Sequence, residues 1–222
     1  MKKKVKNYNQ LSRMLRRILG KTLYRGGMDK RKAIFVHIPK AAGTSVCKAV
    51  FDCPDSSHYT ARCYRSDNPV KFDNYFKFTV VRNPYDRFCS AYNYLKNGGE
   101  RLSEKDKIFR DTFLNDFSDI NDFALHGLYC EELYQRPHFD LQYEYIFDDN
   151  EKTLLVDFVG RMESLEQFTQ QLSNELGTNI DIGHENKTRS AAVCLNDNIT
   201  EQAKARIYEK YKKDFELLGY EK

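Results

Sequence analysis

Two short segments of the chain combine a basic side chain, a hydroxyl group and a change from apolar to helix-forming residues. In the first, residues 35–45, a lysine, a glycine and two hydroxyl-bearing residues follow an apolar run; they are Lys40, Gly43, Thr44 and Ser45. Backbone N–H groups at a helix N-terminus attract an anion, glycine permits close backbone approach, and lysine adds a full positive charge. This order of residue types predicts a binding site for a phosphate-like group.

The second segment, residues 80–90, repeats the pattern with different side chains. Arg82 follows an apolar run, and Ser90 lies in the helix-forming stretch after it. Arginine can grip a phosphate with two parallel hydrogen bonds, and a serine hydroxyl can donate one more. An arginine at the end of a strand more often makes a structural ion pair, but two such segments in succession favour a ligand with two anionic groups.

Two other kinds of protein fit part of this pattern. A nucleotide-dependent phosphotransferase would share the strand, loop and helix, but it needs the Walker A motif G-x-x-x-x-G-K-[ST] and an acid that holds Mg²⁺. Here the lysine precedes the loop and the first glycine of that motif is missing. A non-catalytic module that binds a nucleotide or a membrane through residues 1–32 would make the pairing of Lys40 with Arg82 a coincidence.

Charge is distributed unevenly along the 222 residues, although the formal net charge is only +4. Residues 1–32 hold 12 Lys and Arg and one acid, which leaves 24 basic and 31 acidic residues, a net charge of −7, in residues 33–222. General nucleic-acid binding needs many phosphate contacts from a broad basic face. The acidic body therefore argues against nucleic acid as a partner, and an anionic ligand must meet a local basic cluster.

The first 32 residues are expected to form a basic amphipathic helix ahead of a single domain over residues 33–222. Apolar residues recur at helical spacing with arginines around them: Leu11, Met14, Leu15, Ile18 and Leu19. Such a helix can touch an anionic membrane surface peripherally or pack on its own domain. No apolar run has the length of a membrane span or of a signal peptide, so a cytoplasmic location is expected.

Apolar runs alternate with helix-forming stretches along the rest of the chain. The expected strands cover residues 33–38, 75–81 and 153–160, and the expected helices start near Thr44, follow Pro84, and cover residues 164–176 and 200–218. This alternation implies an α/β fold with a mainly parallel sheet and ligands at the carboxyl ends of the strands. The expected architecture is a P-loop-like three-layer sandwich with a central sheet flanked by helices.

Five motifs resemble those of the family 2 sulfotransferases, which include carbohydrate and heparan sulfate 2-O-sulfotransferases. They are HIPKAAGTS at residues 37–45, HYTA at 58–61, FTVVRNPYDRFCSAY at 78–92, VDFVGRME at 156–163 and YKKDF followed by GY at 211–220. Five such motifs in the right order, over roughly residues 33–220, are specific. One departure is Ala41, where the family more often has Thr; it removes a hydroxyl donor but leaves the lysine and the backbone in place.

The resemblance implies a donor and a reaction. Members of the family transfer a sulfuryl group from 3'-phosphoadenosine 5'-phosphosulfate (PAPS) to an acceptor hydroxyl, here expected on a carbohydrate or glycan. The implied ligands of the 5'-phosphosulfate are Lys40, Ala42, Gly43, Thr44 and Ser45, and those of the 3'-phosphate are Arg82 and Ser90. HENKTR at residues 184–189 resembles the family's H-x-N-K-S stretch and makes Arg189 a further candidate phosphate ligand.

Sulfuryl transfer needs a base beside the acceptor oxygen and positive charge beside the leaving phosphate oxygen. Lys40 is expected to supply the charge. His58 is the first choice for the base, because imidazole titrates near neutral pH and its position resembles that of the catalytic histidine of heparan sulfate 2-O-sulfotransferases; His138 is the alternative. No metal is expected, since the six cysteines show neither a C-x-x-C pair nor histidines at zinc spacing.

Overall fold

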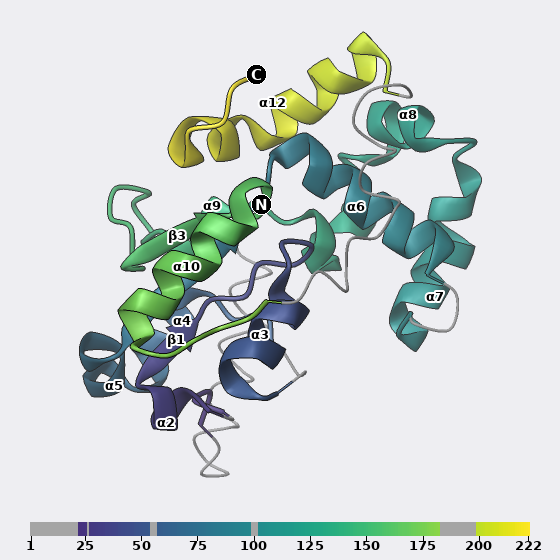
Figure 1. The fold of residues 1–222 in the computed structure, drawn as a ribbon. Helices are drawn as coiled ribbons and strands as arrows, with labels where there is room; N and C mark the ends of the chain where they lie inside the picture. Colours follow the sequence, from purple (N-terminus) through teal and green to yellow (C-terminus); the bar gives the residue numbers. More distant parts are fainter. Residues whose placement is uncertain (1–21, 26, 54–56, 99–101, 183–198) are drawn as a thin grey trace. The chain divides into compact units, whose positions relative to one another are not determined.

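The computed structural model of the chain describes residues 22–25, 27–53, 57–98, 102–182 and 199–222 (Figure 1). The chain divides into two compact units. The first combines the described parts of Met1–Val81 and Gln142–Gly183, and the second those of Arg82–Leu141 and His184–Lys222. Residues 1–21 lie outside the described part, so the basic helix expected there, and the boundary placed after residue 32, stay predictions.

The first unit is built on three parallel strands in the order β1–β2–β3. They are β1 (Ala33–Phe35), β2 (Phe76–Val81) and β3 (Phe158–Arg161). Ala33 pairs with Phe76, and Phe78 pairs with Phe158. All of β1 is buried, as expected of a parallel strand that is covered on both faces and therefore apolar throughout. The parallel sheet predicted from the sequence is confirmed for the described residues.

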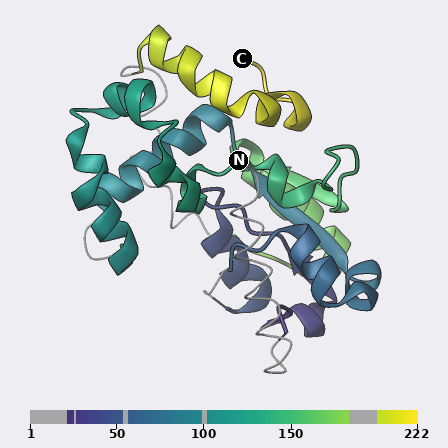
Figure 2. The ribbon, with the colours of Figure 1, turned by 180° about the vertical axis from the view of Figure 1, so that it is seen from behind.

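Helices surround this sheet. They are α2 (Met28–Arg31), α3 (Gly43–Phe51), α4 (Ala61–Asp67), α5 (Pro69–Asn74), α9 (Tyr143–Ile146), the 3-10 turn η6 (Met162–Ser164) and α10 (Leu165–Leu176). Val46 of α3 and Phe168 of α10 pack in one core with Phe35 and Phe78 of the strands. Helices α4 and α5 lie on the side of the sheet away from α10 in the two opposite views (Figures 1 and 2). The α/β class is thus confirmed.

The third strand starts later than predicted. Leu154 forms an isolated antiparallel bridge with Phe147, and β3 begins only at Phe158. Asp148 stabilises the turn between Phe147 and Leu154, because its carboxylate accepts hydrogen bonds from the N–H groups of Lys152 and Thr153. These bonds lower the pKa of Asp148. The apolar run indicates neither which neighbour the segment pairs with nor that all of it is buried, since Leu154 is 43% exposed.

The second unit is helical in its described residues. Its elements are α6 (Pro84–Asn97), α7 (Glu104–Thr112), η2 (Leu114–Asp116), α8 (Ile120–Asp122), the π-turn η3 (Phe123–Gly127), η4 (Glu131–Gln135), η5 (Pro137–Phe139) and α12 (Glu201–Leu218). Phe88 of α6 packs with Phe123 and Phe139 in an aromatic core. The last predicted helix is confirmed as α12, and Thr200 caps it by accepting a hydrogen bond from the Ala203 N–H.

Candidate active site

The loop between β1 and α3 has an unusual backbone. Lys40 and Ala42 have positive φ angles of 68° and 57°, and neither residue is a glycine. The left-handed region costs roughly 1–2 kcal/mol for a residue with a Cβ atom. Such strain persists only where the surrounding structure fixes it, and it gathers at ligand-binding sites. The loop is therefore a candidate site on structural grounds as well as on its sequence.

Helix α3 starts from this loop without a capping side chain in the described residues. Ala42 is its N-cap. The first hydrogen bond of the helix runs from the Val46 N–H to the Ala42 carbonyl oxygen (3.1 Å). The first N–H groups of a helix need partners from outside the helix, and an anion fits both these groups and the helix dipole. The ammonium group of Lys40, a half-buried residue, adds positive charge at the same loop.

The side chains at the start of α3 differ in exposure. Thr44 is exposed, Ser45 is half-buried and Ala42 is half-buried, whereas Ala41 is fully buried. The structure thus brings the whole predicted 5'-phosphosulfate set together at one helix start. The loss of a hydroxyl at Ala41 is accommodated by packing that small side chain inside the protein.

Gly43 is required here for a reason that the sequence did not reveal. A Cβ atom on Gly43 would lie 1.8 Å from Nε2 of His37, so the imidazole ring packs directly on the glycine. His37 is only 5% exposed, and its ring stacks on Phe35 at a centroid distance of 5.6 Å. The sequence offered one signal for this role, a single histidine in an otherwise apolar strand segment before Pro39.

His58 lies beside the same strand segment. Its Nδ1 atom is 3.4 Å from the carbonyl oxygen of His37, and the two imidazole centroids are 4.2 Å apart at an interplanar angle of 53°. His58 itself is exposed, and the helix that follows is capped by Thr60, which accepts a hydrogen bond from the Cys63 N–H. The first unit thus holds both predicted catalytic residues, His58 and Lys40.

The predicted ligands of the 3'-phosphate belong to the second unit. Arg82 is 6% exposed and precedes α6, and Ser90 is half-buried within that helix. The helix starts conventionally, since Asn83 accepts a hydrogen bond from the Tyr85 N–H (2.9 Å) and Pro84 occupies the first turn. Arg189, the third predicted ligand, lies outside the described residues.

Arg87, five residues after Arg82, has a structural role. It is 1% exposed and donates hydrogen bonds to the carbonyl oxygens of His138 and Asp140, with its guanidinium 5.6 Å from the centroid of the Tyr211 ring. His138, the alternative base, is half-buried, and its ring lies 5.4 Å from that of Tyr94. Tyr94 and Arg87, which contact His138, both belong to the second unit.

A family model described as the sulfotransferase family matches residues 28–221. The chain belongs to the sulfotransferase family. The match takes in both units, and with them the loop before α3 and the segment that begins at Arg82. No curated protein and no solved structure gave a match. The resemblance to family 2 is thereby confirmed, and with it sulfuryl transfer as the general activity.

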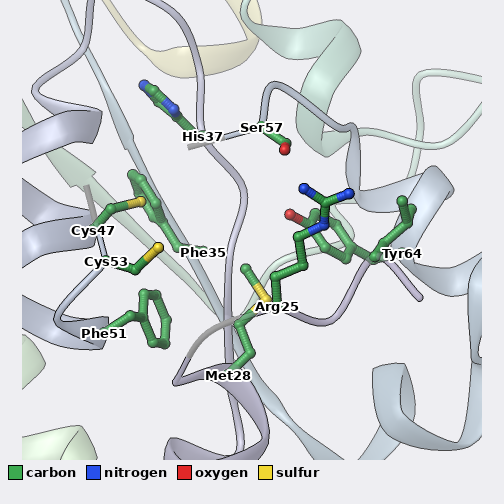
Figure 3. A pocket seen from close by; sticks show the side chains of 10 residues that line it. Arg25, Met28, Phe35, His37, Cys47, Phe51, Cys53, Ser57 and Tyr64 are labelled. Carbon is green, nitrogen blue, oxygen red and sulfur yellow. The ribbon is translucent and has the colours of Figure 1, made fainter. Parts of the chain in front are cut away.

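A small pocket in the first unit of this sulfotransferase borders the loop (Figure 3). It is lined by Leu23, Arg25, Met28, Phe35, His37, Cys47, Phe51, Cys53, Ser57 and Tyr64. The sulfur atoms of Cys47 and Cys53 lie on one side, with Arg25 and Tyr64 on the other. Burial, reinforced by Cys47, raises the pKa of Tyr64, so this phenol is neutral at physiological pH. The pocket reaches the loop through His37, which also touches Gly43.

The described residues of this sulfotransferase contain neither a metal-binding cluster nor a membrane-spanning helix. Within the described residues, no three His, Cys, Asp or Glu side chains gather where they could share a metal ion. None of the five cysteines in the described part is in a disulfide. In that same part of the chain, no helix is both long and apolar enough to cross a membrane. A reaction without a metal stays a prediction.

Proposed function

We propose that this sulfotransferase takes its sulfuryl group from PAPS and transfers it to a hydroxyl group of a carbohydrate or glycan. The observation that carries the donor is the strained loop at Lys40 and Ala42, which leads into a helix with no side-chain cap in the described residues. A phosphosulfate supplies the hydrogen-bond acceptors that such a helix start needs. The proposal includes the finer architecture, a P-loop-like three-layer sandwich.

Arg82 and Ser90 are the proposed ligands of the 3'-phosphate, the group that distinguishes PAPS from ATP and adenosine 5'-phosphate. The support is the position of Arg82 in the family motif, together with its burial. Arg87 donates to two backbone carbonyls, and Arg82 directly precedes α6, where the resemblance to the family places a phosphate ligand. Because Arg82 is 6% exposed, its charge is only weakly screened by water. Arg189 is proposed as a third ligand.

In the proposed reaction, the acceptor oxygen bonds to sulfur while the bond from sulfur to the bridging phosphate oxygen breaks. The electron pair of that bond leaves on the phosphate of 3'-phosphoadenosine 5'-phosphate. Lys40 and the N–H groups at the start of α3 stabilise the charge that develops there. The proton of the acceptor hydroxyl passes to His58, which is exposed and therefore accessible to an acceptor.

Calorimetric titration of 3'-phosphoadenosine 5'-phosphate tests the donor, with adenosine 5'-phosphate and ATP as comparison ligands. We expect micromolar binding that needs the 3'-phosphate and no Mg²⁺. Arg82→Ala should weaken it by about 10–100-fold, because a hydrogen bond to a charged group contributes about 1.5–3 kcal/mol. Equal binding of ATP, or Mg²⁺-dependent binding, would instead favour a phosphotransferase and overturn the proposal.

Transfer from radiolabelled PAPS tests the role of Lys40. Lys40→Ala should lower kcat by about 10²–10³-fold, the usual loss when one donor to a developing charge is removed. Lys48→Ala is the matched control, since Lys48 is an exposed lysine in the last turn of the same helix. Equal rates in the two variants would exclude Lys40 from the reaction.

The acceptor and the location of the enzyme are proposed from the sequence. The carbohydrate acceptor follows from the motifs shared with carbohydrate sulfotransferases, and the cytoplasmic location, with peripheral membrane contact through residues 1–32, follows from sequence alone. Offering the enzyme labelled PAPS with a set of oligosaccharides and a set of phenols separates the acceptor classes. Label on phenols only would overturn the carbohydrate assignment.

A further inference from the structure

The ring of His37 packs against residues of the candidate site, yet the proposed reaction gives His37 no role. Its buried ring stacks on Phe35, fills the space beside Gly43 and lies 4.2 Å from the ring of His58. Phe35 belongs to β1 and Gly43 is the first residue of α3, whereas His58 lies in the connection that precedes α4. His37 therefore connects the phosphate loop to the candidate base.

The backbone of His37 also acts on His58. Nδ1 of His58 lies 3.4 Å from the His37 carbonyl oxygen. A carbonyl oxygen can only accept a hydrogen bond, so this contact is a hydrogen bond only in the tautomer that carries the hydrogen on Nδ1. The neutral ring then has its lone pair on Nε2, and this atom is the one left to take a proton from an acceptor.

We infer that His37 is a positioning residue, which holds His58 in the tautomer with a basic Nε2 and ties that ring to the loop at Gly43. The inference rests on the proposed function, in which His58 is the base. Because Gly43 has the helical backbone of the first residue of α3, no unusual φ angle requires a glycine there. A glycine is needed at position 43 because any Cβ atom there would collide with the ring of His37.

The coupling of His37 to His58 is measured by a double-mutant cycle on kcat with saturating PAPS. His37→Ala should lower kcat by about 10–100-fold, the loss expected when a catalytic group is misplaced by about 1 Å, with a smaller change in the KM for PAPS. In a His58→Ala background the same substitution should change kcat less than threefold or so, because a positioning residue has nothing left to position. Additive losses would overturn the inference.

A second double-mutant cycle tests whether the ring of His37 is the reason for a glycine at position 43. It pairs Gly43→Ala with His37→Ala and measures the affinity for 3'-phosphoadenosine 5'-phosphate. Gly43→Ala alone should weaken binding by about tenfold or more, because the new methyl group displaces the His37 ring and with it the loop. In a His37→Ala background, Gly43→Ala should cost much less affinity. An equal loss in both backgrounds would mean that the bound phosphate, and not His37, requires the glycine.

The tautomer of His58 can be read in the wild-type protein, so the inference does not depend on any variant folding. In histidine-labelled protein, long-range ¹H–¹⁵N correlations distinguish an Nδ1-protonated ring from an Nε2-protonated one. At a pH where His58 is neutral, we expect protonation at Nδ1. Protonation at Nε2 would overturn the inference.

These measurements separate the failure of the inference from the failure of the proposed function. Wild-type enzyme that neither binds 3'-phosphoadenosine 5'-phosphate nor transfers the sulfuryl group would remove the proposed function, and the inference with it. Full activity in His58→Ala would remove the base and also the inference, but it would leave the donor assignment intact. Normal binding and transfer with additive cycles would remove the role of His37 alone.

Discussion

The two strand-to-helix junctions of the chain, residues 35–45 and 80–90, resemble each other in sequence and are built in opposite ways. In the first, Lys40 and Ala42 adopt left-handed backbone angles, and α3 begins without a side-chain cap in the described residues. The local structure is strained and leaves the helix start to an outside partner. We therefore expect an anion at this junction to be bound mainly by backbone N–H groups.

In the second junction the protein supplies its own cap. Asn83 accepts a hydrogen bond from the Tyr85 N–H, Pro84 occupies the first turn, and neither Arg82 nor Asn83 has a positive φ angle. The backbone is relaxed, so any affinity for an anion must come from side chains. The comparison shows that an anion site at the first junction would rely on backbone N–H groups, and one at the second junction on an arginine side chain.

The largest effect on stability is expected at Arg87, which belongs to the relaxed junction. Arg87→Ala should lower the free energy of unfolding by about 3 kcal/mol, because two partly buried carbonyl groups lose the charged donor of a buried arginine. Urea unfolding followed by circular dichroism measures this loss. Arg65, exposed in α4, is the control and should change little when replaced by alanine. A small loss at Arg87 would show that this segment does not need its buried arginine.

A smaller effect is expected at the cap of the same helix. Asn83→Ala should lower the free energy of unfolding by about 1 kcal/mol, since the Tyr85 N–H loses its side-chain partner. Asn83→Asp keeps an acceptor at the same place and should recover most of the loss. If alanine and aspartate behave alike in urea unfolding, the cap does not stabilise α6, and the contrast between the junctions weakens.

The sequence located the elements well where local chemistry decides them. The strand segments near residues 33–38 and 75–81 were found because buried parallel strands are apolar throughout. The end of α10 follows from Gly177, whose φ of 58° is easy for glycine, and the start of α12 follows from Thr200. The same local signals placed Lys40 and its neighbours at a helix start.

What the sequence could not supply depends on contacts between distant residues. Nothing in the residue types predicts a left-handed alanine at position 42, because loop closure imposes that angle against the preference of the residue. The contact of His37 with Gly43 is a matter of shape. Arg82 and Arg87 stand five residues apart, and only tertiary packing shows that Arg87 is held by the carbonyl groups of residues 138 and 140.

The smallest and sharpest test of the comparison is Ala42→Gly. Glycine removes a left-handed strain of about 1–2 kcal/mol and adds about 0.5–1 kcal/mol of chain entropy to the unfolded state. The protein should therefore become more stable by about 0.5 kcal/mol. If the strain keeps the loop in its binding shape, affinity for 3'-phosphoadenosine 5'-phosphate should fall a few-fold in the same variant.

The matched control is Ala49→Gly, the same substitution at a helical position of α3. It should lower the free energy of unfolding by about 1 kcal/mol, the difference in helix propensity between alanine and glycine. Opposite signs at positions 42 and 49 would establish that the first junction stores strain. A loss of stability at both positions would mean that Ala42 is relaxed, and the two junctions would then differ only in their caps.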